Sequence, residues 1–525
     1  MTMAGVPVQW IVPFAITCLM VLLVTVSRWR RNKFSYFKKQ GIPGPEPSLV
    51  SGHFHQIWSE NALRIRDEWS RKYGDIYGFF NGDAPFLMVK YLELLRRVFV
   101  TDFGKFLNKG DVWAMLNENL LLRNSLTFAR DNQWKLMRRL VATTFSASKL
   151  RRMIPSVTET VDRFLGLLEK RCQETPSGEV DVCPMLAALA FDVAAETACG
   201  LRLDVQHKPG DQHYTSVRSM RAKLISGGFH KAGQYFSGIK PLVRLIGLLE
   251  RQFGHEPLTE LARKAKPIVE LRAKDPSLSQ PDLIQNFLEA KIPEELYREL
   301  EFKSRTNEKG DYRVPLTDIA ANAATVLVAG FETVQVSSAY CLYSLAKYPN
   351  VQEKVREEVN ASYNKHGDFT YDAITDLPYT TQVIFETLRL YSPAFSFTTR
   401  KASCDYHYKG IIIPQGTSIM ACTEQIHMDP SLWNKPEEFN PDRFSPEQKS
   451  TWDPLAFQPY GMGPRNCAGI KLAQATMCLL LAKTVHRYRL HLGSQHENAD
   501  LKLQTQAVLV VPKDGVWVRL ETLQR

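Results

Sequence analysis

The longest uninterrupted apolar stretch of the chain lies near its N-terminus, at Val8–Val26. It reads VQWIVPFAITCLMVLLVTV, carries no charge, and would measure about 28 Å as a helix, which matches the hydrocarbon thickness of a bilayer. No basic residue precedes it, and four follow closely: Arg28, Arg30, Arg31 and Lys33. This order indicates an uncleaved signal-anchor that leaves the rest of the chain in the cytosol. A buried core helix is the alternative, which Pro13 and the terminal position disfavour.

The segment after this stretch reads first as a linker and then as mixed secondary structure. Phe34–Gln40 is aromatic and basic, and Gly41–Pro47 (GIPGPEP) forms a stiff proline hinge. A helical pattern follows at Ala62–Tyr73. Turn residues at 81–83 then separate two predicted strands, Ile76–Phe80 and Pro85–Lys90.

Helical periodicity dominates the rest of the chain. Amphipathic helices are predicted between about Pro155 and Leu300, and a long apolar helix covers Thr317–Ala346, between two prolines. Two short hairpins are also predicted, each around a turn: Ile411–Pro414 with Thr417–Ala421, and Ala507–Pro512 with Val516–Leu520. The pattern therefore predicts a mainly α protein with a small β portion.

Composition narrows the function classes. Lys and Arg number 66 against 55 Asp and Glu, which gives a net charge of +11, but the basic residues are spread out rather than clustered. This excludes a nucleic-acid-binding patch and suits an anionic membrane surface or an acidic protein partner. The nine cysteines are scattered and contain no C-x-x-C, so we expect neither a disulfide framework nor a zinc site, and a reducing compartment.

The most informative short segment is the glycine-rich run Phe457–Lys471 (FQPYGMGPRNCAGIK), which leads into an apolar helical segment. Such a loop can press its backbone against a flat ligand. It places the thiol of Cys467 near a helix N-terminus, where unpaired N–H groups favour the metal-ligating thiolate. The alternative is an inert buried cysteine. The spacing G-x-R-x-C-x-G argues against that alternative, with members Gly463, Arg465, Cys467 and Gly469.

Three weaker motifs lie on predicted helices. Trp134 and Arg138 are four residues apart, so they share a face and could both reach one carboxylate. A surface helix with Trp under an arginine stem is the alternative. Glu386 and Arg389 lie at i,i+3 on the helix Tyr379–Tyr391 and can form an ion pair, although E-x-x-R is common in helical proteins.

The third motif lies inside the long helix Thr317–Ala346. It reads Ala329-Gly330-Phe-Glu332-Thr333, which combines two small residues with an acid and a hydroxyl. Glycine inside a helix costs about 1 kcal/mol relative to alanine, so close approach of another group is expected there. Ordinary helix packing with a solvated glutamate is the alternative.

The cysteine run resembles the haem-binding loop of the cytochrome P-450 family, the haem-thiolate monooxygenases, and the other motifs follow in that family's order. The resemblance implies a cytochrome P-450 fold preceded by one transmembrane helix, with haem b as cofactor. Cys467 would be the axial iron ligand. Arg465, Trp134, Arg138 and Arg400 would hold the haem propionates, and four small residues would border the haem: Gly463, Gly469, Ala329 and Gly330.

The resemblance also implies roles on the distal side of the haem and behind the cysteine loop. Glu332 and Thr333 would organise water that delivers protons to the haem centre, and Val334 stands where the family often has a second threonine. Arg443 would complete a supporting cluster with Glu386 and Arg389. The substrate pocket would include Phe395, Phe397 and the variable loop Phe103–Leu126. Two further positions depart from the family pattern, Tyr460 in place of phenylalanine and Ser392 in place of proline.

The implied function is insertion of one oxygen atom of O₂ into a lipophilic small molecule, such as a xenobiotic, steroid or fatty acid. Because no G-x-G-x-x-G fingerprint is present, electrons should come from NADPH through NADPH-cytochrome P-450 reductase, with cytochrome b5 as a further candidate partner. Within this family, the chain most resembles the animal group that contains the drug-metabolising enzymes and thromboxane synthase. A peroxide-rearranging isomerase is the first alternative, and a haem-based sensor or carrier is the second.

The implied organisation has three parts. Residues 1–33 form the signal-anchor with its basic flank, residues 34–47 the linker and hinge, and residues 48–525 the haem-thiolate catalytic domain. The expected location is the endoplasmic reticulum membrane, with a single pass and a cytosolic catalytic domain. The apolar stretch Leu224–Leu249, with scattered Lys and Arg, is either core or the part of the family fold that dips into the bilayer.

Overall fold

The computed structural model describes residues 8–253, 256–292, 294, 305–306, 312–497 and 499–523. The predicted helical region up to Leu300 therefore ends outside the described residues.

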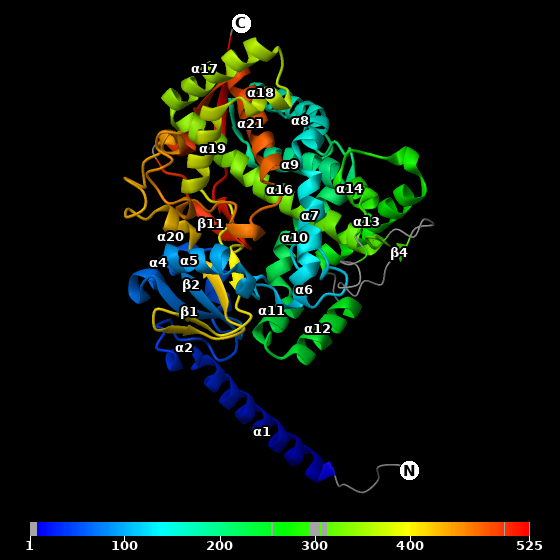
Figure 1. Ribbon diagram of the computed structural model, residues 1–525, viewed down its shortest axis with the longest axis vertical. Coiled ribbons are helices and arrows are strands. Elements are labelled where there is room, and N and C mark those ends of the chain that lie inside the picture. Colours follow the sequence, from blue (N-terminus) through cyan, green and yellow to red (C-terminus); the bar gives the residue numbers. More distant parts are fainter. Residues whose placement is uncertain are drawn as a thin grey trace.

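In Figure 1 a helical bulk is joined by a smaller β-rich part at the lower left, and α1 projects from that end of the molecule. The described helices are α1 (Val8–Phe34), α2 (Tyr36–Lys39), α3 (Phe54–Ile57), α4 (Ala62–Tyr73), α5 (Leu92–Arg96), α6 (Ala114–Asn117), α7 (Asp131–Thr144), α8 (Ala147–Glu174), α9 (Cys183–Cys199), α10 (Gln212–Ser226), α11 (Gly228–Tyr235), α12 (Lys240–Phe253), α13 (Pro257–Lys274), α14 (Leu283–Glu289), α16 (Leu316–Lys347), α17 (Pro349–His366), α18 (Tyr371–Thr375), α19 (Pro378–Leu390), α20 (Thr423–His427), α21 (Ile470–Arg487) and α22 (Ser494–Glu497).

Helix α16 is the central element of the fold. It begins after Pro315, carries Asp318 in its first turn and Lys347 in its last, and so complements the helix dipole at both ends. It is buried along most of its length, and the alanine-rich helix α9 packs closely against it. The largest hydrophobic core joins α16 to α8, α9, α17, α19 and α21. This confirms the predicted long helix to within one residue at each end.

The β portion is split into small sheets. The strands are β1 (Ile76–Asn81), β2 (Ala84–Val89), β3 (Glu179–Asp181), β4 (Arg305–Thr306), β5 (Tyr312–Arg313), β6 (Thr399–Lys401), β7 (Tyr406–Tyr408), β8 (Ile411–Ile413), β9 (Ser418–Ala421), β10 (Tyr488–Leu492), β11 (Leu503–Gln506), β12 (Leu509–Pro512) and β13 (Trp517–Thr522). The largest described sheet has the order β1-β2-β9-β6. The two predicted strands are present as β1 and β2, and they pair as an antiparallel hairpin with Phe79 opposite Phe86.

The two predicted C-terminal hairpins are wrong in their pairing, although their strands are present. Strand β8 pairs with β7, while β9 pairs with β2 and β6. Likewise β12 pairs with β11, while β13 pairs with β10 and β3. The turn residues between the expected partners mark changes of direction, but packing against distant strands decides which edges meet.

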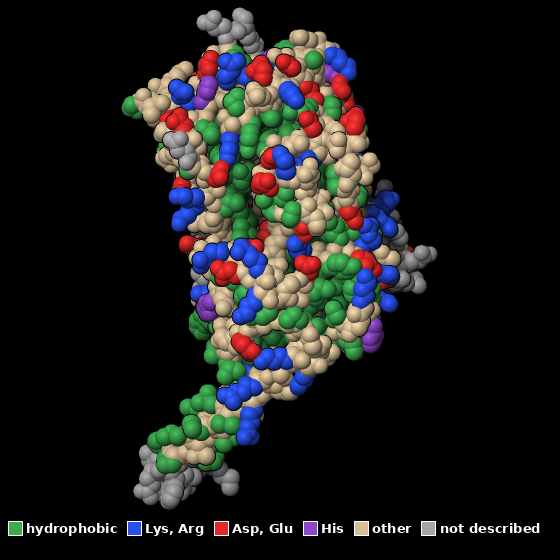
Figure 2. Space-filling model, turned by 90° about the vertical axis from the view of Figure 1, so that its left-hand side faces the viewer, with side chains coloured by type: hydrophobic (Ala, Val, Ile, Leu, Met, Phe, Trp, Pro, Cys, Tyr) green, Lys and Arg blue, Asp and Glu red, His purple; other side chains and the backbone are tan. Residues whose placement is uncertain are grey.

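Two described helices are long and apolar enough to cross a membrane, α1 over Val12–Phe34 and α16. None of the apolar window of α1 is buried, whereas 61% of that of α16 is buried. Figure 2 shows the exposed apolar surface of α1 projecting from the body, with Lys and Arg side chains gathered where the helix meets it. Composition and burial therefore favour α1 as the membrane segment and identify α16 as a core helix.

Candidate active site

The cysteine loop is held in a conformation that requires glycine. Gly461 and Gly463 have φ values of +68° and +69°. A Cβ on Gly463 would lie 1.9 Å from the carbonyl oxygen of Phe99, so no other residue fits there. The backbone N–H of Cys467 donates to the carbonyl of Tyr460 at 2.8 Å, and α21 begins three residues later, at Ile470. The thiol thus lies just before a helix N-terminus, as predicted from the sequence.

The surroundings of Cys467 form a hollow inside the protein. The side chain of Cys467 is exposed. Even so, desolvation by the surrounding protein raises the pKa of the thiol, against the lowering effects of the Gly469 N–H and of Arg138 and Lys109. A Cβ on Gly469 would contact no atom within 4 Å. The Cys467 side chain is therefore accessible although protein surrounds it, so another group could contact its sulfur from this hollow.

Arg465 is one of several cations around this space. Its Nε donates to the carbonyl of Leu107 at 2.6 Å, its Nη2 donates to that of Ala129 at 2.9 Å, and the guanidinium lies 4.3 Å from the centroid of the Trp134 indole. Its Nη1 is buried and has no hydrogen-bond partner. Desolvation lowers the pKa of Arg465 to about 9.

Arg400 and Lys109 lie near Arg465, and their positive charges are desolvated in the same way. Arg400 is 2% exposed and donates to the carbonyls of Thr399 and Met462 at 2.8 and 2.9 Å. Desolvation and then Arg465 lower its pKa well below the usual value. Desolvation, Arg465 and Arg400 lower the pKa of Lys109 to about 7. Sequence reasoning missed Lys109, because a lysine in a variable loop carries no motif.

The tryptophan–arginine pair on α7 does share a face, but its members contact different partners. Trp134 lies under Arg465 and meets Phe103 edge-on at 5.7 Å. Arg138 donates to the backbone carbonyl of Asn466 at 2.6 Å and also to its side-chain oxygen. Arg138 therefore holds the residue that precedes Cys467, a contact that the sequence pattern does not predict.

These cations form no ion pair with a carboxylate in the described part of the chain. Unpaired buried charge is costly, so a cluster of this kind requires an anionic partner. A group with two carboxylates beside a metal that accepts a thiolate satisfies both the cations and Cys467. Haem, with its two propionates, fits this donor set.

The middle of α16 carries small side chains on an accessible face. Ala329 is exposed and Thr333 is half-buried, although most of the helix is buried, and the two lie on one face at i,i+4. The Thr333 hydroxyl donates to the Ala329 carbonyl at 2.7 Å. Gly330 faces α9 instead, where an added Cβ would lie 3.7 Å from that of Ala194. Such a distance is an ordinary van der Waals contact, so packing against α9 tolerates a small side chain here and does not require glycine.

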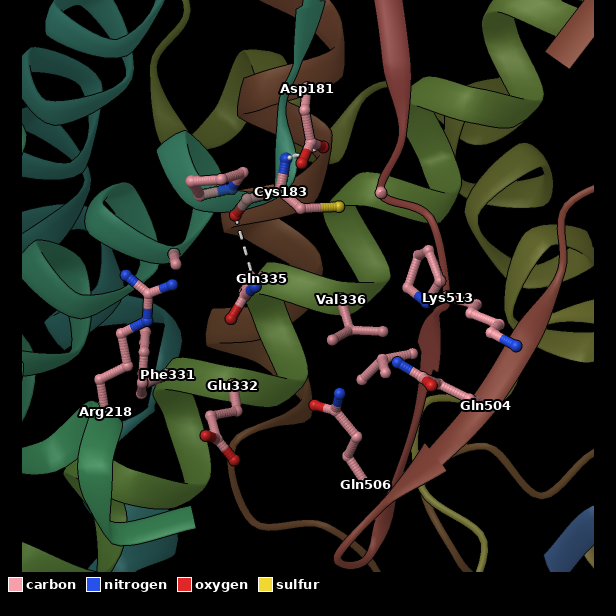
Figure 3. A pocket seen from close by; sticks show the side chains of 15 residues that line it. Asp181, Cys183, Arg218, Phe331, Glu332, Gln335, Val336, Gln504, Gln506 and Lys513 are labelled. Carbon is pink, nitrogen blue, oxygen red and sulfur yellow. Dashed lines mark hydrogen bonds between the residues drawn. The ribbon is translucent and has the colours of Figure 1, made fainter. Parts of the chain in front are cut away.

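Glu332 points to a different space from Thr333. It lines a polar pocket of about 200 Å³ between α9, α16 and the β11–β12 hairpin. Figure 3 shows its carboxylate at the edge of this pocket, on the same helix as Gln335, with Gln506 reaching in from strand β11. Gln335 donates a hydrogen bond to the Cys183 carbonyl at 3.3 Å. Glu332 lines this pocket, and Thr333, the next residue of α16, does not.

The predicted supporting cluster is assembled. Arg389 donates from Nε and Nη2 to both carboxylate oxygens of Glu386 at 2.7 and 2.9 Å, with both side chains fully buried. Arg443 donates from Nε to Glu386 at 3.2 Å. Sequence reasoning missed the link from this cluster to the cysteine loop. His427 accepts the N–H of Gln458 on Nε2 at 2.8 Å and so carries its proton on Nδ1, which donates to the Arg389 carbonyl at 3.0 Å.

The two candidate pocket phenylalanines lie in different places. Phe395 is 3% exposed and packs under the guanidinium of Arg66, 4.4 Å from its ring centroid, so it belongs to a core cluster. Phe397 lines a cavity of about 20 Å³ together with Lys109 and Trp113. A much larger and partly charged cavity, of about 1200 Å³, lies between α6, α12, α13 and the start of α16.

Comparison with known proteins agrees with this geometry. The family model for cytochrome P450 matches residues 42–518, so the chain belongs to the cytochrome P450 family. It is a cytochrome P450 monooxygenase whose cofactor is haem b. Among individual proteins, it is 28% identical over 509 residues to cytochrome P450 3A2 of Rattus norvegicus, covering 95% of this chain and 96% of the relative. Cytochrome P450 3A41 of Mus musculus and 3A29 of Sus scrofa are also 28% identical, over 515 and 506 residues.

Proposed function

We propose that this protein is a membrane-anchored monooxygenase that inserts one oxygen atom of O₂ into a lipophilic small molecule, with electrons delivered from NADPH by a reductase. The observation that carries the proposal is the pairing of a desolvated thiol, Cys467, with buried cations that no described carboxylate neutralises. When bound, haem supplies the iron centre at which O₂ is reduced and the substrate is oxidised. The residues of the chain bind it, exclude water and move protons.

Cofactor binding is assigned to the residues that already converge on the hollow. Cys467 would ligate the iron as a thiolate. The Gly469 N–H, Arg138 and Lys109 favour the charged form, and the bound metal would supply the rest of the stabilisation against the desolvation that raises the thiol pKa. Arg465, Arg400 and Lys109 would neutralise the propionates, and Trp134 would hold Arg465 in place through its ring. Arg138 would fix the loop through Asn466.

Proton delivery is assigned to Thr333 and Glu332. Splitting O₂ into one inserted oxygen atom and one water molecule consumes two electrons and two protons. The protons must come from solvent. Thr333 carries its hydroxyl on the accessible face of α16, and Glu332 lines the polar pocket, which would hold the water that supplies the protons. Val334 is buried and supplies no hydroxyl, so Thr333 alone would position the last proton donor.

Membrane attachment is assigned to α1, with the catalytic part in the cytosol at the endoplasmic reticulum. The exposed apolar surface of α1 and the basic residues at its end support this orientation. The family match begins at residue 42, inside the proline hinge, which supports a catalytic domain that starts near residue 48. NADPH-cytochrome P-450 reductase is the proposed donor and cytochrome b5 a second electron carrier.

The test is oxygen-isotope labelling. The purified full chain, reductase and NADPH are incubated under ¹⁸O₂ with a steroid, a fatty acid and an aromatic xenobiotic, and products are analysed by mass spectrometry. The proposal expects one ¹⁸O atom per product and dependence on NADPH. Products formed from a lipid peroxide without NADPH or O₂ would identify a peroxide isomerase instead.

A further inference from the structure

The cytosolic end of α1 is docked into the body of the protein. Arg30, in the predicted basic flank, is only 3% exposed. It donates from Nη1 to the carbonyl of Tyr235 at 2.9 Å and from Nη2 to that of Val50 at 2.8 Å. Its guanidinium lies 5.1 Å from the ring centroids of both Phe34 and Phe236. Because its guanidinium is buried and hydrogen-bonded within the protein, Arg30 cannot also bind lipid headgroups.

One buried carboxylate joins α1 to the segment between α11 and α12. Lys33 on α1 lies 2.9 Å from Oδ2 of Asp83, whose side chain is fully buried in the turn between β1 and β2. The other oxygen, Oδ1, accepts the Ser237 hydroxyl at 2.5 Å and the Gly238 N–H at 2.7 Å. The single side chain of Asp83 thus contacts the anchor on one side and the α11–α12 turn on the other.

The two turns pack closely around this carboxylate. A Cβ on Gly238 would lie 2.0 Å from Nζ of Lys33, and one on Gly82 would lie 1.9 Å from the carbonyl oxygen of Gln234. Phe34 and Phe37 are buried and meet Phe80 of β1 at 4.8 and 5.3 Å. The junction therefore has the properties of a protein core rather than of a flexible tether.

Helix α12 extends from this junction with an exposed apolar face. Leu245, Leu248, Leu249 and Phe253 are 52%, 58%, 40% and 75% exposed, while Val243 and Ile246 face inward. Figure 1 shows α11 and α12 at the same end of the molecule as α1. If α1 spans the bilayer, the position of this apolar face relative to the lipid depends on the contacts of Asp83.

We propose that the Asp83 carboxylate fixes the end of the membrane helix α1 to the α11–α12 turn, and we call this contact the lock. Because of the lock, α1 and the apolar helix α12 move as one unit. The anchor therefore sets the height of α12 at the bilayer. The inference rests on the proposed membrane anchoring only for its last part. The lock itself depends on the contacts of Lys33 and Asp83 and also holds in detergent.

Hydrogen–deuterium exchange of the full-length holoprotein in phosphatidylcholine nanodiscs tests the lock. Lys33→Met leaves the Asp83 carboxylate buried without its cation, which is unfavourable. We expect at least about tenfold faster exchange at Ser237–Ile239 and at residues 31–37, with no change in the distant helix α17. The matched control is Arg31→Met, which removes an exposed charge from the same flank and should leave exchange within about twofold of wild type.

Two outcomes overturn the proposal. Equal effects of Lys33→Met and Arg31→Met would show that only the charge of the flank matters, and faster exchange in α1 alone would show that the α11–α12 turn is not coupled to it. Asp83→Asn, with the same readout, serves if Lys33→Met misfolds, since it keeps the side-chain shape. Flotation of the same samples with vesicles reports membrane anchoring separately, so failure of the anchor and failure of the lock are distinguishable.

Discussion

Nε2 of His427 lies 2.8 Å from the backbone nitrogen of Gln458 and accepts its hydrogen, while Nδ1 donates to the carbonyl of Arg389. The histidine is fully buried, and desolvation followed by the charge of Arg389 lowers its pKa to about 3. A permanently neutral imidazole with a fixed tautomer therefore joins the Glu386–Arg389 pair to the start of the cysteine loop.

Replacing this histidine should destabilise the loop more than an ordinary surface change would. His427→Leu leaves the Gln458 N–H and the Arg389 carbonyl without partners, at a cost of about 1–3 kcal/mol for each group. We expect a lower melting temperature and loss of the thiolate-type spectrum of the carbon monoxide complex at temperatures that wild type withstands. His407→Leu, at an exposed position, is the control. An unchanged spectrum with His427→Leu would show that the loop needs no such support.

Arg138→Met should weaken haem binding by about tenfold or more, because it removes two hydrogen bonds from a charged donor to Asn466. The measurement is the rate of haem transfer to apomyoglobin. Arg139→Met provides a matched control, since Arg139 is the next residue on α7 and is exposed. Equal transfer rates for the two variants would remove Arg138 from haem retention.

Thr333→Ala should divert electrons to hydrogen peroxide while haem stays bound. The hydroxyl is the proposed proton-positioning group on the open face of α16, so its loss slows protonation rather than cofactor binding. Peroxide formed per NADPH consumed should rise several-fold. Thr325→Ala is the control, because Thr325 makes the same i−4 backbone hydrogen bond on α16 but is buried. Unchanged coupling in Thr333→Ala would exclude it from proton delivery.

Asp318→Asn should stabilise the protein at neutral pH but not at pH 4. Desolvation raises the pKa of Asp318 to about 6, against the lowering effect of Asn124, which donates to both carboxylate oxygens at 3.3 and 3.2 Å. The folded state therefore binds the proton more tightly than the unfolded state, and stability is lost as pH rises from about 4 to 6. The loss at pH 7 is about 3 kcal/mol. Melting temperatures of the two proteins should converge at pH 4, and a constant difference across this range would contradict the assignment.

The fold class and the ends of the long helix α16 could be predicted from local patterns. The prolines around α16 and the glycines of the cysteine loop impose their backbone geometry directly, so their boundaries follow from the sequence. Strand partners could not be predicted, because β8 and β9 are adjacent in sequence yet belong to different sheets. Their partners depend on packing against distant strands.

The contacts of the candidate site likewise fall into those that local spacing predicts and those that it does not. Glu386 and Arg389 meet because they are three residues apart on a helix. Cys467 lies just before α21 because the glycine-rich loop leads directly into that helix. Lys109 and His427 carry no sequence motif, since their roles arise only from burial and from contacts between separate segments. Lys109 lies near Arg400 and Arg465, about 290 and 360 residues away, and His427 bonds to residues 38 and 31 positions away. Phe395 was expected in the pocket, but its ring packs under Arg66, a contact between segments more than 300 residues apart.

The most direct test of the account is the carbon monoxide spectrum of the purified protein and of Cys467→Ser, each reduced either by NADPH with added reductase or by dithionite. The account predicts the same red-shifted, thiolate-type band with both reductants for wild type, and no such band with either reductant for Cys467→Ser. Persistence of the band in Cys467→Ser would contradict the ligand assignment. A band that dithionite produces but NADPH with reductase does not would contradict the electron route and favour peroxide rearrangement.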